Sequence, residues 1–361
     1  MWRWLAVALL ITLVPCAQAQ KRKTKTALPD GPIVAGELGK QLDAHVLALD
    51  RDAGGLCGAA LVAVKGEIVL EKGYGVADAD KAEPMRHDAL FDWASISKQF
   101  TAAAVLKLEM KKKLSIGDTL AKHFKDAPED KREITLEQML THTSGIQKGF
   151  RPEWKWDSSR RDSLFELVLG LPVESKPGTK FEYNNTTYGF VAALVEKLAG
   201  KSFEDFCIDE LFRPAGMKSA GFIGHHELDA ARVPRDDRGR GNKFPYGPIL
   251  NWGYRGCGGT IASVREMFLW DRALRSDEIL SDAAKRKMFT PALEGYAFGW
   301  YVGPDERGTR IEHGGDTRAT TAYFGRWVEE DIVVAIAYTH KPAVYKFETG
   351  RALAKLVRDA K

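Results

Sequence analysis

Two β-forming regions lie at opposite ends of this chain and enclose a helical middle, and this arrangement limits the fold most strongly. Near the C-terminus, residues 331–339 (DIVVAIAYT) are nearly all apolar, as in a central strand buried on both faces. Residues 58–78 hold two β-rich runs on either side of Lys65-Gly66, a pattern typical of a hairpin. The pattern predicts one sheet built from the two termini, with a helical region inserted between them.

Helix signals dominate the middle of the chain. The stretch Thr135-Leu136-Glu137-Gln138 is a capping box, and residues 185–199 predict a helix that ends at Gly200. Apolar residues at helical spacing from Val34 to Leu49 predict an amphipathic helix at the start of the fold. Further helices are expected over 263–274 and 345–359, and further strands over 296–303, 310–315 and 320–328.

These elements predict a mixed α/β fold in a single domain spanning residues 33–361. Its α/β part is expected over 33–80 and 260–361, and its mainly helical part over 81–259. The length of 361 residues and the 44% of hydrophobic residues are enough for a large core.

The first residues are typical of a secretory signal rather than of the fold. Arg3 is followed by an apolar run from Leu5 to Val14 and by Ala17-Gln18-Ala19, an A-x-A cleavage site. The run is too short to cross a membrane. We therefore predict a signal peptide over 1–19, cleaved after Ala19, and an exported protein that is periplasmic or extracellular.

The residues after this signal add little structure of their own. Cys16 invites comparison with a lipid anchor, but Pro15 stands where a small residue is wanted, which argues against one. Residues 20–32 predict a basic, flexible tether, which favours cell-wall association. The formal net charge of +4 is too small and too dispersed to favour a nucleic-acid partner.

The remaining cysteines have no metal-ligand spacing. Cys57, Cys207 and Cys257 lie among apolar residues or glycines and are expected to be small buried residues, although one disulfide stays open in an oxidising compartment. The stretch His225-His226-Glu227 lacks a third ligand at a compatible spacing. We expect no metal and no cofactor.

The segment FDWASISKQF, Phe91–Phe100, carries the first chemical signal. Ser95 and Lys98 are spaced i, i+3, so on a helix they lie on one face, one turn apart. Serine needs a neighbouring base to act as a nucleophile, and a lysine serves as that base when burial lowers its pKa. Serine is also a preferred N-cap, so this pair alone is a weak signal.

Two later stretches strengthen the signal. FEYNNTTYG places Tyr183 on a loop before a helix, and RIEHGGD places His313-Gly314-Gly315 in the C-terminal strand region. With Ser95 and Lys98, they resemble the S-x-x-K, Y-x-N and K/H-x-G elements of the serine β-lactamase and penicillin-binding-protein superfamily, in its class C-like branch. Further stretches that resemble this branch are LTHTSGI (140–146), PGTKFEYNN (177–185), LFRPAGM (211–217) and YRGCGGTIAS (254–263).

The resemblance implies a three-layer α/β/α sandwich with a mainly antiparallel sheet. It implies that Ser95 is acylated, that Lys98 helps to remove its proton, and that Tyr183 is the partner base that later protonates the leaving group. Asn185 would hold Lys98 and the acyl amide of the substrate. The backbone N–H groups of Ser95 and Asp316 would form the oxyanion hole.

The third element departs from the family pattern. His313 and Gly314 replace the lysine and hydroxyl residue that typically hold a substrate carboxylate, so His313 and Gly315 are assigned only to a substrate-binding strand. Asp316 adds negative charge beside that strand, while Arg318 either compensates for it or binds a carboxylate itself.

These features predict a secreted serine hydrolase that acts through an acyl-enzyme on esters or small amides. The first alternative is a D,D-peptidase or β-lactamase acting on cell-wall peptides or β-lactams. The others are an inactive binding protein on the same fold and a structural protein of the cell wall.

Overall fold

The computed structural model describes residues 30–49, 55–78, 82–148, 157–235, 250–317, 319–339 and 346–360. Within these ranges, no helix combines the length and the apolar character needed to cross a membrane. The expected signal peptide and most of the expected tether lie outside the described residues, as does Arg318. Residues Pro32–Lys361 form one compact unit.

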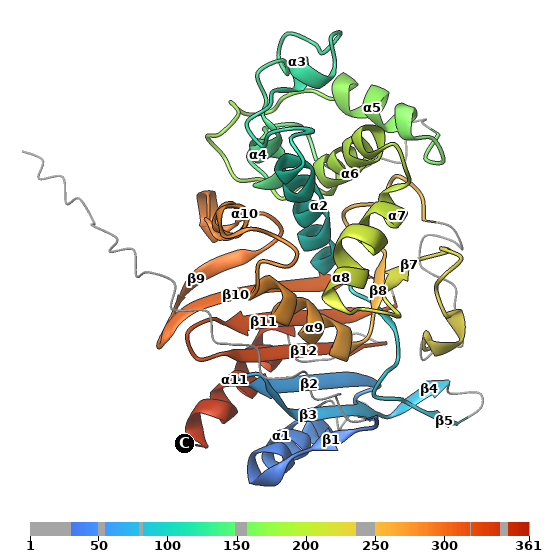
Figure 1. Cartoon of the computed structure of the whole chain (residues 1–361), viewed down its shortest axis with the longest axis vertical. Helices are drawn as coiled ribbons and strands as arrows, with labels where there is room; N and C mark the ends of the chain where they lie inside the picture. The colour runs from blue at the N-terminus through green and yellow to red at the C-terminus, as the bar shows by residue number, and fades with distance from the viewer. Residues whose placement is uncertain are drawn as a thin grey trace, which may run out of the picture. The chain divides into compact units, whose positions relative to one another are not determined.

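A seven-stranded antiparallel sheet forms the centre of this unit (Figure 1). In spatial order its strands are β1 (Ile33–Val34), β3 (Glu67–Tyr74), β2 (Gly58–Val64), β12 (Ile332–Tyr338), β11 (Thr321–Trp327), β10 (Gly308–Asp316) and β9 (Tyr301–Asp305). Every strand comes from one of the two ends of the chain, so the prediction of one sheet built from both termini is confirmed. The apolar strand β12 is central, and all of its residues are buried, as its composition predicts.

The N-terminal hairpin is confirmed as well. Strands β2 and β3 pair antiparallel, and the turn between them places Lys65 at φ 52° and Gly66 at φ 83°. Two residues with positive φ match the twist of the flanking strands, which explains why a glycine occupies the second position.

Helices cover both faces of the sheet. On one face lie α1 (Gly36–Ala48) and α11 (Lys346–Asp359), which bury a compact apolar cluster against the strands. The other face is covered by α9 (Val264–Leu274) and by the segment that begins the helical region (Figure 1). The layers therefore follow the expected α/β/α order.

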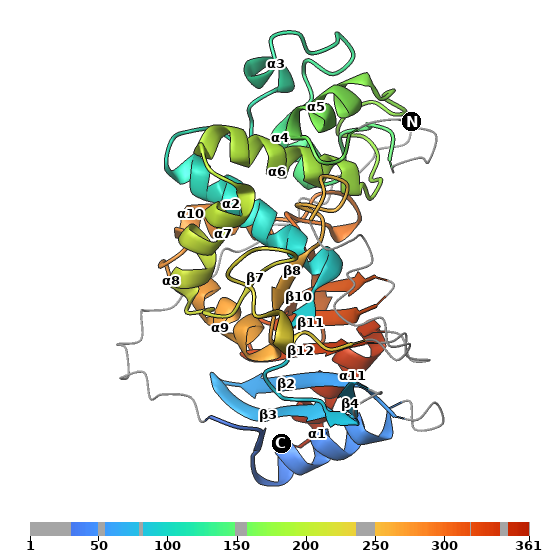
Figure 2. The ribbon, with the colours of Figure 1, turned by 90° about the vertical axis from the view of Figure 1, so that its right-hand side faces the viewer.

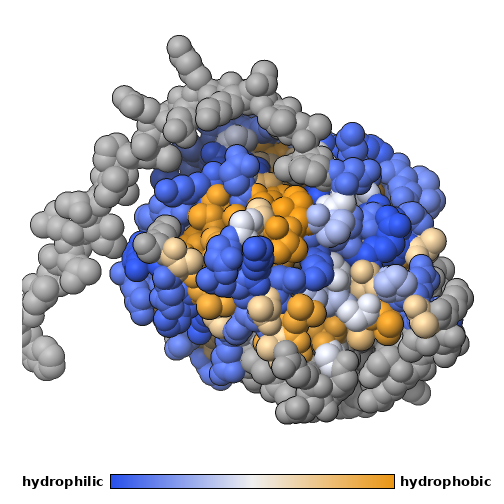
Figure 3. All heavy atoms as spheres, turned by 90° about the horizontal axis from the view of Figure 1, so that it is seen from below, coloured by the Kyte–Doolittle hydropathy of each residue, from blue (hydrophilic) through white to orange (hydrophobic). Residues whose placement is uncertain are grey.

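Helix α1 shows how an amphipathic helix covers the sheet. Leu42 and Val46 are fully buried against it, whereas Leu47 on the other side is 52% exposed. Seen from below the orientation of Figure 1, the surface mixes apolar areas with hydrophilic side chains (Figure 3). The predicted helical spacing is confirmed, because the buried residues recur four positions apart.

The helical region lies between the two sheet-forming segments in sequence. Its α-helices are α2 (Lys98–Met110), α3 (Leu120–His123), α4 (Leu136–Leu140), α5 (Arg161–Gly170), α6 (Asn185–Ala199), α7 (Phe203–Cys207) and α8 (Arg213–Ala215). Helix α10 (Asp282–Phe289) belongs to the later, C-terminal segment. Shorter helical turns are η2 (Ala94–Ser97), η3 (Ile208–Phe212), η4 (Ala230–Arg232) and η5 (Leu293–Gly295). Two small sheets pair β4 (Val76–Asp78) with β5 (Glu83–Pro84), and β6 (Phe91–Asp92) with β8 (Thr260–Ala262) and β7 (Gly221–Phe222).

The predicted helix ends are found where the sequence places them. Thr135 and Gln138 form the capping box of α4, and α6 ends at Gly200 with φ 73°. Glycine takes this left-handed conformation without the penalty that a side chain would bring.

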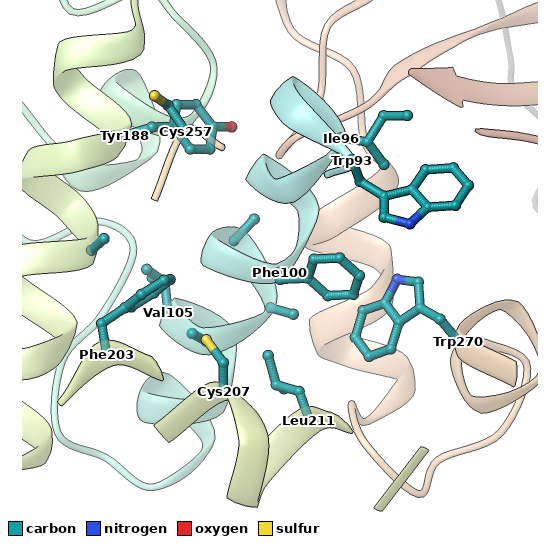
Figure 4. Close-up of a cluster of buried hydrophobic side chains, with 14 of the residues drawn as sticks. Trp93, Ile96, Phe100, Val105, Tyr188, Phe203, Cys207, Leu211, Cys257 and Trp270 are labelled. Carbon is teal, nitrogen blue, oxygen red and sulfur yellow. The ribbon is translucent and has the colours of Figure 1, made fainter. Parts of the chain in front are cut away.

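Helix α2 runs between the sheet and the helical region, as the two perpendicular views show (Figures 1 and 2). The ring of Phe100 lies 4.9 Å from that of Trp270, and Trp93 and Ile96 lie nearby on the same side (Figure 4). Because α2 is buried on all sides for most of its length, its first turn is held rigidly.

Candidate active site

Ser95 lies in the turn η2, and α2 begins at Lys98. Ser95 therefore precedes the α-helix by one 3₁₀ turn. The Nζ atom of Lys98 donates a hydrogen bond to Oγ of Ser95 at 3.1 Å, and no side-chain capping bond is made at the start of η2 or of α2. Ser95 thus faces Lys98 instead of capping the helix.

The residue before Ser95 holds an uncommon backbone conformation. Ala94 has φ 47°, a region that costs a non-glycine residue about 1–3 kcal/mol. Its N–H donates to Oδ1 of Asp92 at 2.8 Å, and the Tyr254 hydroxyl donates to Oδ2 at 2.9 Å. Burial raises the pKa of Asp92 to about 6. This buried carboxyl group fixes the turn that presents Ser95.

Lys98 is fully buried and has no carboxylate partner among the described residues. Its second hydrogen bond goes to the carbonyl oxygen of Cys257, at 3.0 Å. Burial lowers the pKa of Lys98 to about 8, because a charged ammonium is poorly solvated there. Much of this lysine is therefore neutral near pH 8, and a neutral amine accepts a proton from serine.

Tyr183 lies against the same lysine. The Lys98 Nζ atom is 4.7 Å from the centre of the Tyr183 ring. The Tyr183 hydroxyl is buried, and within the described ranges no atom meets the distance and angle criteria of a hydrogen bond to it. Burial raises the pKa of Tyr183, and the neighbouring Ser95 hydroxyl opposes that rise. The structure thus brings Ser95, Lys98 and Tyr183 together, as the sequence predicts.

A histidine that the sequence analysis did not select holds the Tyr183 turn. Nδ1 of His142 accepts the backbone N–H of Asn184 at 3.1 Å, and the carbonyl oxygen of His142 accepts the N–H of Glu182 at 2.8 Å. The His142 ring also lies 4.3 Å from that of Tyr183. The stretch LTHTSGI contained this residue, but only the tertiary contact reveals its position beside the site.

Asn185 does not take the place expected for it. Its side chain is exposed and makes no hydrogen bond within the described part of the chain, whereas Lys98 bonds to Ser95 and Cys257. The neighbouring Asn184 is the buried member of the pair and caps α6. The predicted contact between Asn185 and Lys98 is therefore absent from this structure.

Strand β10 approaches the nucleophile turn at a glycine. A Cβ atom on Gly315 would lie 2.4 Å from the Trp93 carbonyl oxygen and 3.3 Å from the Ser95 nitrogen, so a side chain would push the strand away. Strand β9 pairs with β10 only from Gly308 to Glu312. In the described part of the chain, residues 313–316 therefore keep a strand edge without a β partner on that side, close to Ser95.

His313 is a neutral residue of this strand. It is only 2% exposed; Nδ1 donates to the Gly314 carbonyl oxygen at 2.7 Å, and Nε2 accepts the Tyr296 hydroxyl at 3.1 Å. Burial, helped by the charge of Lys98, lowers the pKa of His313 to about 3. His313 therefore cannot supply the missing positive charge at neutral pH.

Asp316 at the end of β10 has a partner that the sequence analysis missed. Its carboxylate pairs with the Lys346 ammonium of α11 and accepts the Thr321 hydroxyl at 3.0 Å. Arg318, the compensating cation expected from the sequence, lies outside the described residues.

All three cysteines in the described part of the chain are free thiols. Cys207 and Cys257 are buried, as expected, and Cys57 is half-buried. The disulfide left open by the sequence is not formed.

The family is decided by a match over most of the chain. A family model described as Beta-lactamase matches residues 42–358. The chain belongs to the β-lactamase family. Its predicted place in the serine β-lactamase and penicillin-binding-protein superfamily is thereby confirmed.

Relatives of this β-lactamase family member agree with that assignment. The chain is 31% identical over 262 residues to the putative penicillin-binding protein PbpX of Bacillus subtilis, covering 72% of this chain. The match spans only 65% of the length of PbpX.

Solved structures show the same fold. An octameric penicillin-binding protein homologue from Pyrococcus abyssi has a TM-score of 0.74 and 23% identity, covering 90% of this chain and 78% of the other. A D-amino acid amidase from Ochrobactrum anthropi SV3, complexed with L-phenylalanine amide, has a TM-score of 0.76 and 20% identity, covering 90% and 99%. The predicted mixed α/β fold with a mainly antiparallel sheet is confirmed.

Proposed function

We propose that this protein is a secreted serine hydrolase that acts through an acyl-enzyme on esters or small amides. One observation carries the proposal: Ser95 accepts a hydrogen bond at 3.1 Å from a buried lysine whose pKa is lowered to about 8. An unpaired buried lysine is costly to a fold, and a lowered pKa next to a hydroxyl is what a catalytic base requires.

In this mechanism, neutral Lys98 accepts the Ser95 proton as Oγ attacks the substrate carbonyl carbon. The carbonyl π electrons move to its oxygen, which the N–H groups of Ser95 and Asp316 would stabilise. As the bond to the leaving group breaks, the Tyr183 hydroxyl, next to both groups, donates its proton to the leaving group and receives a replacement from the Lys98 ammonium, while the carbonyl double bond forms again. Water then attacks the acyl-enzyme by the same proton route in reverse, which releases the acid and restores Ser95.

The substrate preference rests on the strand that follows the site. His313 is neutral, and no hydroxyl side chain occupies the positions of Gly314 and Gly315, so the H-G-G element lacks the usual groups for a substrate carboxylate. The alternative, a D,D-peptidase or β-lactamase, draws support from the penicillin-binding name of the relative. The name of the D-amino acid amidase neighbour supports small amides instead.

The test is a hydrolysis panel of a p-nitrophenyl ester, D-amino-acid amides, a D-Ala-D-Ala peptide and a chromogenic cephalosporin. We expect the ester or an amide to have the highest kcat/KM. Ser95→Ala should lose turnover and fluorophosphonate labelling by several orders of magnitude while it unfolds at the same temperature. Near-normal turnover in folded Ser95→Ala would refute the mechanism, and wild-type protein that neither reacts nor labels would favour an inactive binding protein.

Export is part of the same proposal and is supported by the apolar run and the A-x-A site before Gln20. N-terminal sequencing of the protein from the periplasm or medium of the producing cells is expected to begin at Gln20. A mature protein that keeps residues 1–19, or that carries lipid on Cys16, would contradict cleavage after Ala19.

A further inference from the structure

The backbone N–H groups on either side of Tyr183 both bond to His142. The N–H of Glu182 donates to the carbonyl oxygen of His142 at 2.8 Å, and the N–H of Asn184 donates to its Nδ1 atom at 3.1 Å. His142 therefore holds the residue before Tyr183 and the residue after it. This matters for chemistry, because a displacement of about 1 Å at a reacting group costs about a hundredfold in rate.

The ring of His142 also packs among the aromatic rings of the site. Its centre lies 4.3 Å from that of Tyr183, 5.0 Å from that of Tyr188 and 4.6 Å from that of Tyr296. The Nζ atom of Lys98 lies 4.7 Å from the centre of the Tyr183 ring. Tyr183 is therefore in contact both with the proposed base and with the histidine that holds its turn.

His142 is a neutral residue with one defined tautomer. Because its Nδ1 atom accepts the Asn184 N–H, the ring proton is on Nε2. Burial, together with the charge of Lys98, lowers the pKa of His142 well below its usual value. The Nδ1 acceptor therefore stays available to the backbone beside Tyr183 at neutral pH.

The fold keeps this histidine in spite of two unfavourable features. The backbone of His142 has φ 58°, a strained region for a residue other than glycine. Its Nε2 atom is buried, and no group in the described part of the chain forms a hydrogen bond with it. Strain and unpaired buried polar atoms of this kind concentrate at functional positions, which favours a role in the site over a purely structural one.

We propose that His142 is a positioning residue for the proton transfer of this site: its Nδ1 atom fixes the backbone at Asn184 and so holds Tyr183 where its hydroxyl protonates the leaving group. This inference rests on the proposed function. His142 neither gains nor loses a proton, and no covalent bond to it forms or breaks. Its loss should therefore matter most for a leaving group that depends strongly on the proton from Tyr183.

The experiment compares a p-nitrophenyl ester with the phenyl ester of the same acyl group. p-Nitrophenolate is weakly basic and departs with little help, whereas phenolate is more basic and depends more on general-acid catalysis. The measured quantity is the ratio of kcat/KM for the phenyl ester to kcat/KM for the p-nitrophenyl ester. Ser95→Ala supplies the background rate for both esters.

Three substitutions of His142 test the acceptor. His142→Leu should lower kcat/KM roughly a hundredfold for the phenyl ester and less than about tenfold for the p-nitrophenyl ester, so the ratio falls. His142→Asn should keep the wild-type ratio, because its side-chain oxygen is as many bonds from Cβ as Nδ1 and asparagine tolerates positive φ. His142→Gln carries the same amide one bond farther out and should show the loss, which provides the test if His142→Leu does not fold.

Two controls separate positioning from stability. Thr187→Val removes a buried hydroxyl that donates to the Met139 carbonyl oxygen at 3.3 Å, between the same two segments. It should lower the unfolding temperature and leave the ratio unchanged. In a Tyr183→Phe background, His142→Leu should cause no further change in the ratio, because the hydroxyl that it positions is already absent.

The outcomes distinguish this inference from the proposed function. If neither ester is cleaved in a Ser95-dependent way, the proposed function fails and this inference fails with it. If both esters are cleaved but His142→Leu and His142→Gln slow them equally, or His142→Asn loses the wild-type ratio, His142 does not act through Tyr183. A fall of the ratio in Thr187→Val, or a further fall in the Tyr183→Phe background, would overturn the inference as well.

Discussion

The molecule buries charge in two regions and treats it in opposite ways. In the site, Lys98 is fully buried, and its hydrogen-bond partners among the described residues are a hydroxyl and a carbonyl oxygen. Between α9 and β11, Asp271 is also fully buried, but it pairs with Arg272, Arg275 and Arg326. Burial alone would raise the pKa of Asp271, and the three guanidinium groups outweigh it and hold that pKa well below its usual range.

The difference indicates which buried charge serves stability and which serves chemistry. A carboxylate with three cationic partners stays charged at every ordinary pH and ties a helix to a strand. A lysine without a carboxylate partner has its pKa moved towards neutrality, where it can exchange a proton. Substitutions of Lys98 and Asp271 test whether these two roles separate.

The largest effect is expected for Lys98→Met, which keeps most of the side-chain volume but removes the amine. We expect kcat/KM to fall at least about 10³-fold, since the Lys98 amine is the base that hydrogen-bonds to the Ser95 hydroxyl. The free energy of unfolding should stay the same or rise, because a poorly solvated ammonium is removed. Chemical denaturation measures the stability. A Lys98→Met protein that is active, or that is severely destabilised, would contradict the assignment of Lys98 to chemistry instead of stability.

The Tyr183→Phe variant tests whether Tyr183 acts together with Lys98. If Lys98 and Tyr183 act as one coupled proton acceptor, each single change should lower acylation steeply and the double change should cost far less than the product of both. Pre-steady-state acylation rates of the four proteins provide the cycle. Losses that multiply would show that the two groups act independently.

Asp271→Asn should lose stability and keep activity, the reverse of the result expected for Lys98→Met. It leaves three buried or half-buried arginines without their common carboxylate, and breaking a buried ion pair typically costs about 3–5 kcal/mol of stability. The protein that remains folded should keep its kcat/KM within a few-fold, because the described ionic partners of Asp271 are arginines of α9 and β11 and not residues of the site. Urea unfolding and active-site titration separate these quantities, and a loss of turnover at unchanged stability would contradict the assignment.

The pH dependence is the next largest effect. Lys98 is the base only when deprotonated, so kcat/KM should rise with pH and level off above about pH 8. At pH 6 it should be roughly a hundredfold below the plateau, following tenfold per pH unit. His313, with its pKa lowered to about 3, should add no limb between pH 5 and 9. A limb near pH 6.5 in place of one near 8 would point to a histidine base.

Much of the fold and the Ser95–Lys98 pair could be predicted because their signals are local, whereas the role of Tyr183 was implied by the family resemblance. The hairpin at Lys65-Gly66, the capping box at Thr135 and the glycine stop at Gly200 each depend on residues a few positions apart. Ser95 and Lys98 are one turn apart, so helix geometry alone brings them together.

The remainder of the site could not be predicted, because it depends on contacts between distant segments. The carbonyl oxygen of Cys257 holds Lys98 across 159 positions, and His142 meets Asn184 across 42. The partner of Asp316 comes from α11, thirty positions away, whereas the sequence offered the nearby Arg318. Asn185 fits the Y-x-N pattern by spacing, yet it is Asn184 that the turn buries.

The smallest effect concerns Tyr296→Phe, which removes one neutral hydrogen bond inside the site. The Tyr296 hydroxyl donates to Nε2 of His313, whose Nδ1 proton is already committed to the Gly314 carbonyl oxygen. Without that hydroxyl, a buried nitrogen acceptor is left unsatisfied, which costs about 1 kcal/mol of stability. Turnover should change less than tenfold, because no charge is lost and Lys98 keeps both of its partners.

Denaturant unfolding and kcat/KM for the preferred substrate measure the two effects, with Tyr301→Phe as a matched control at a neighbouring ring 5.4 Å from His313. A hundredfold loss of turnover in Tyr296→Phe alone would mean that His313 takes part in proton transfer, and that the proton passes along a chain of polar groups in the site instead of through Lys98 and Tyr183.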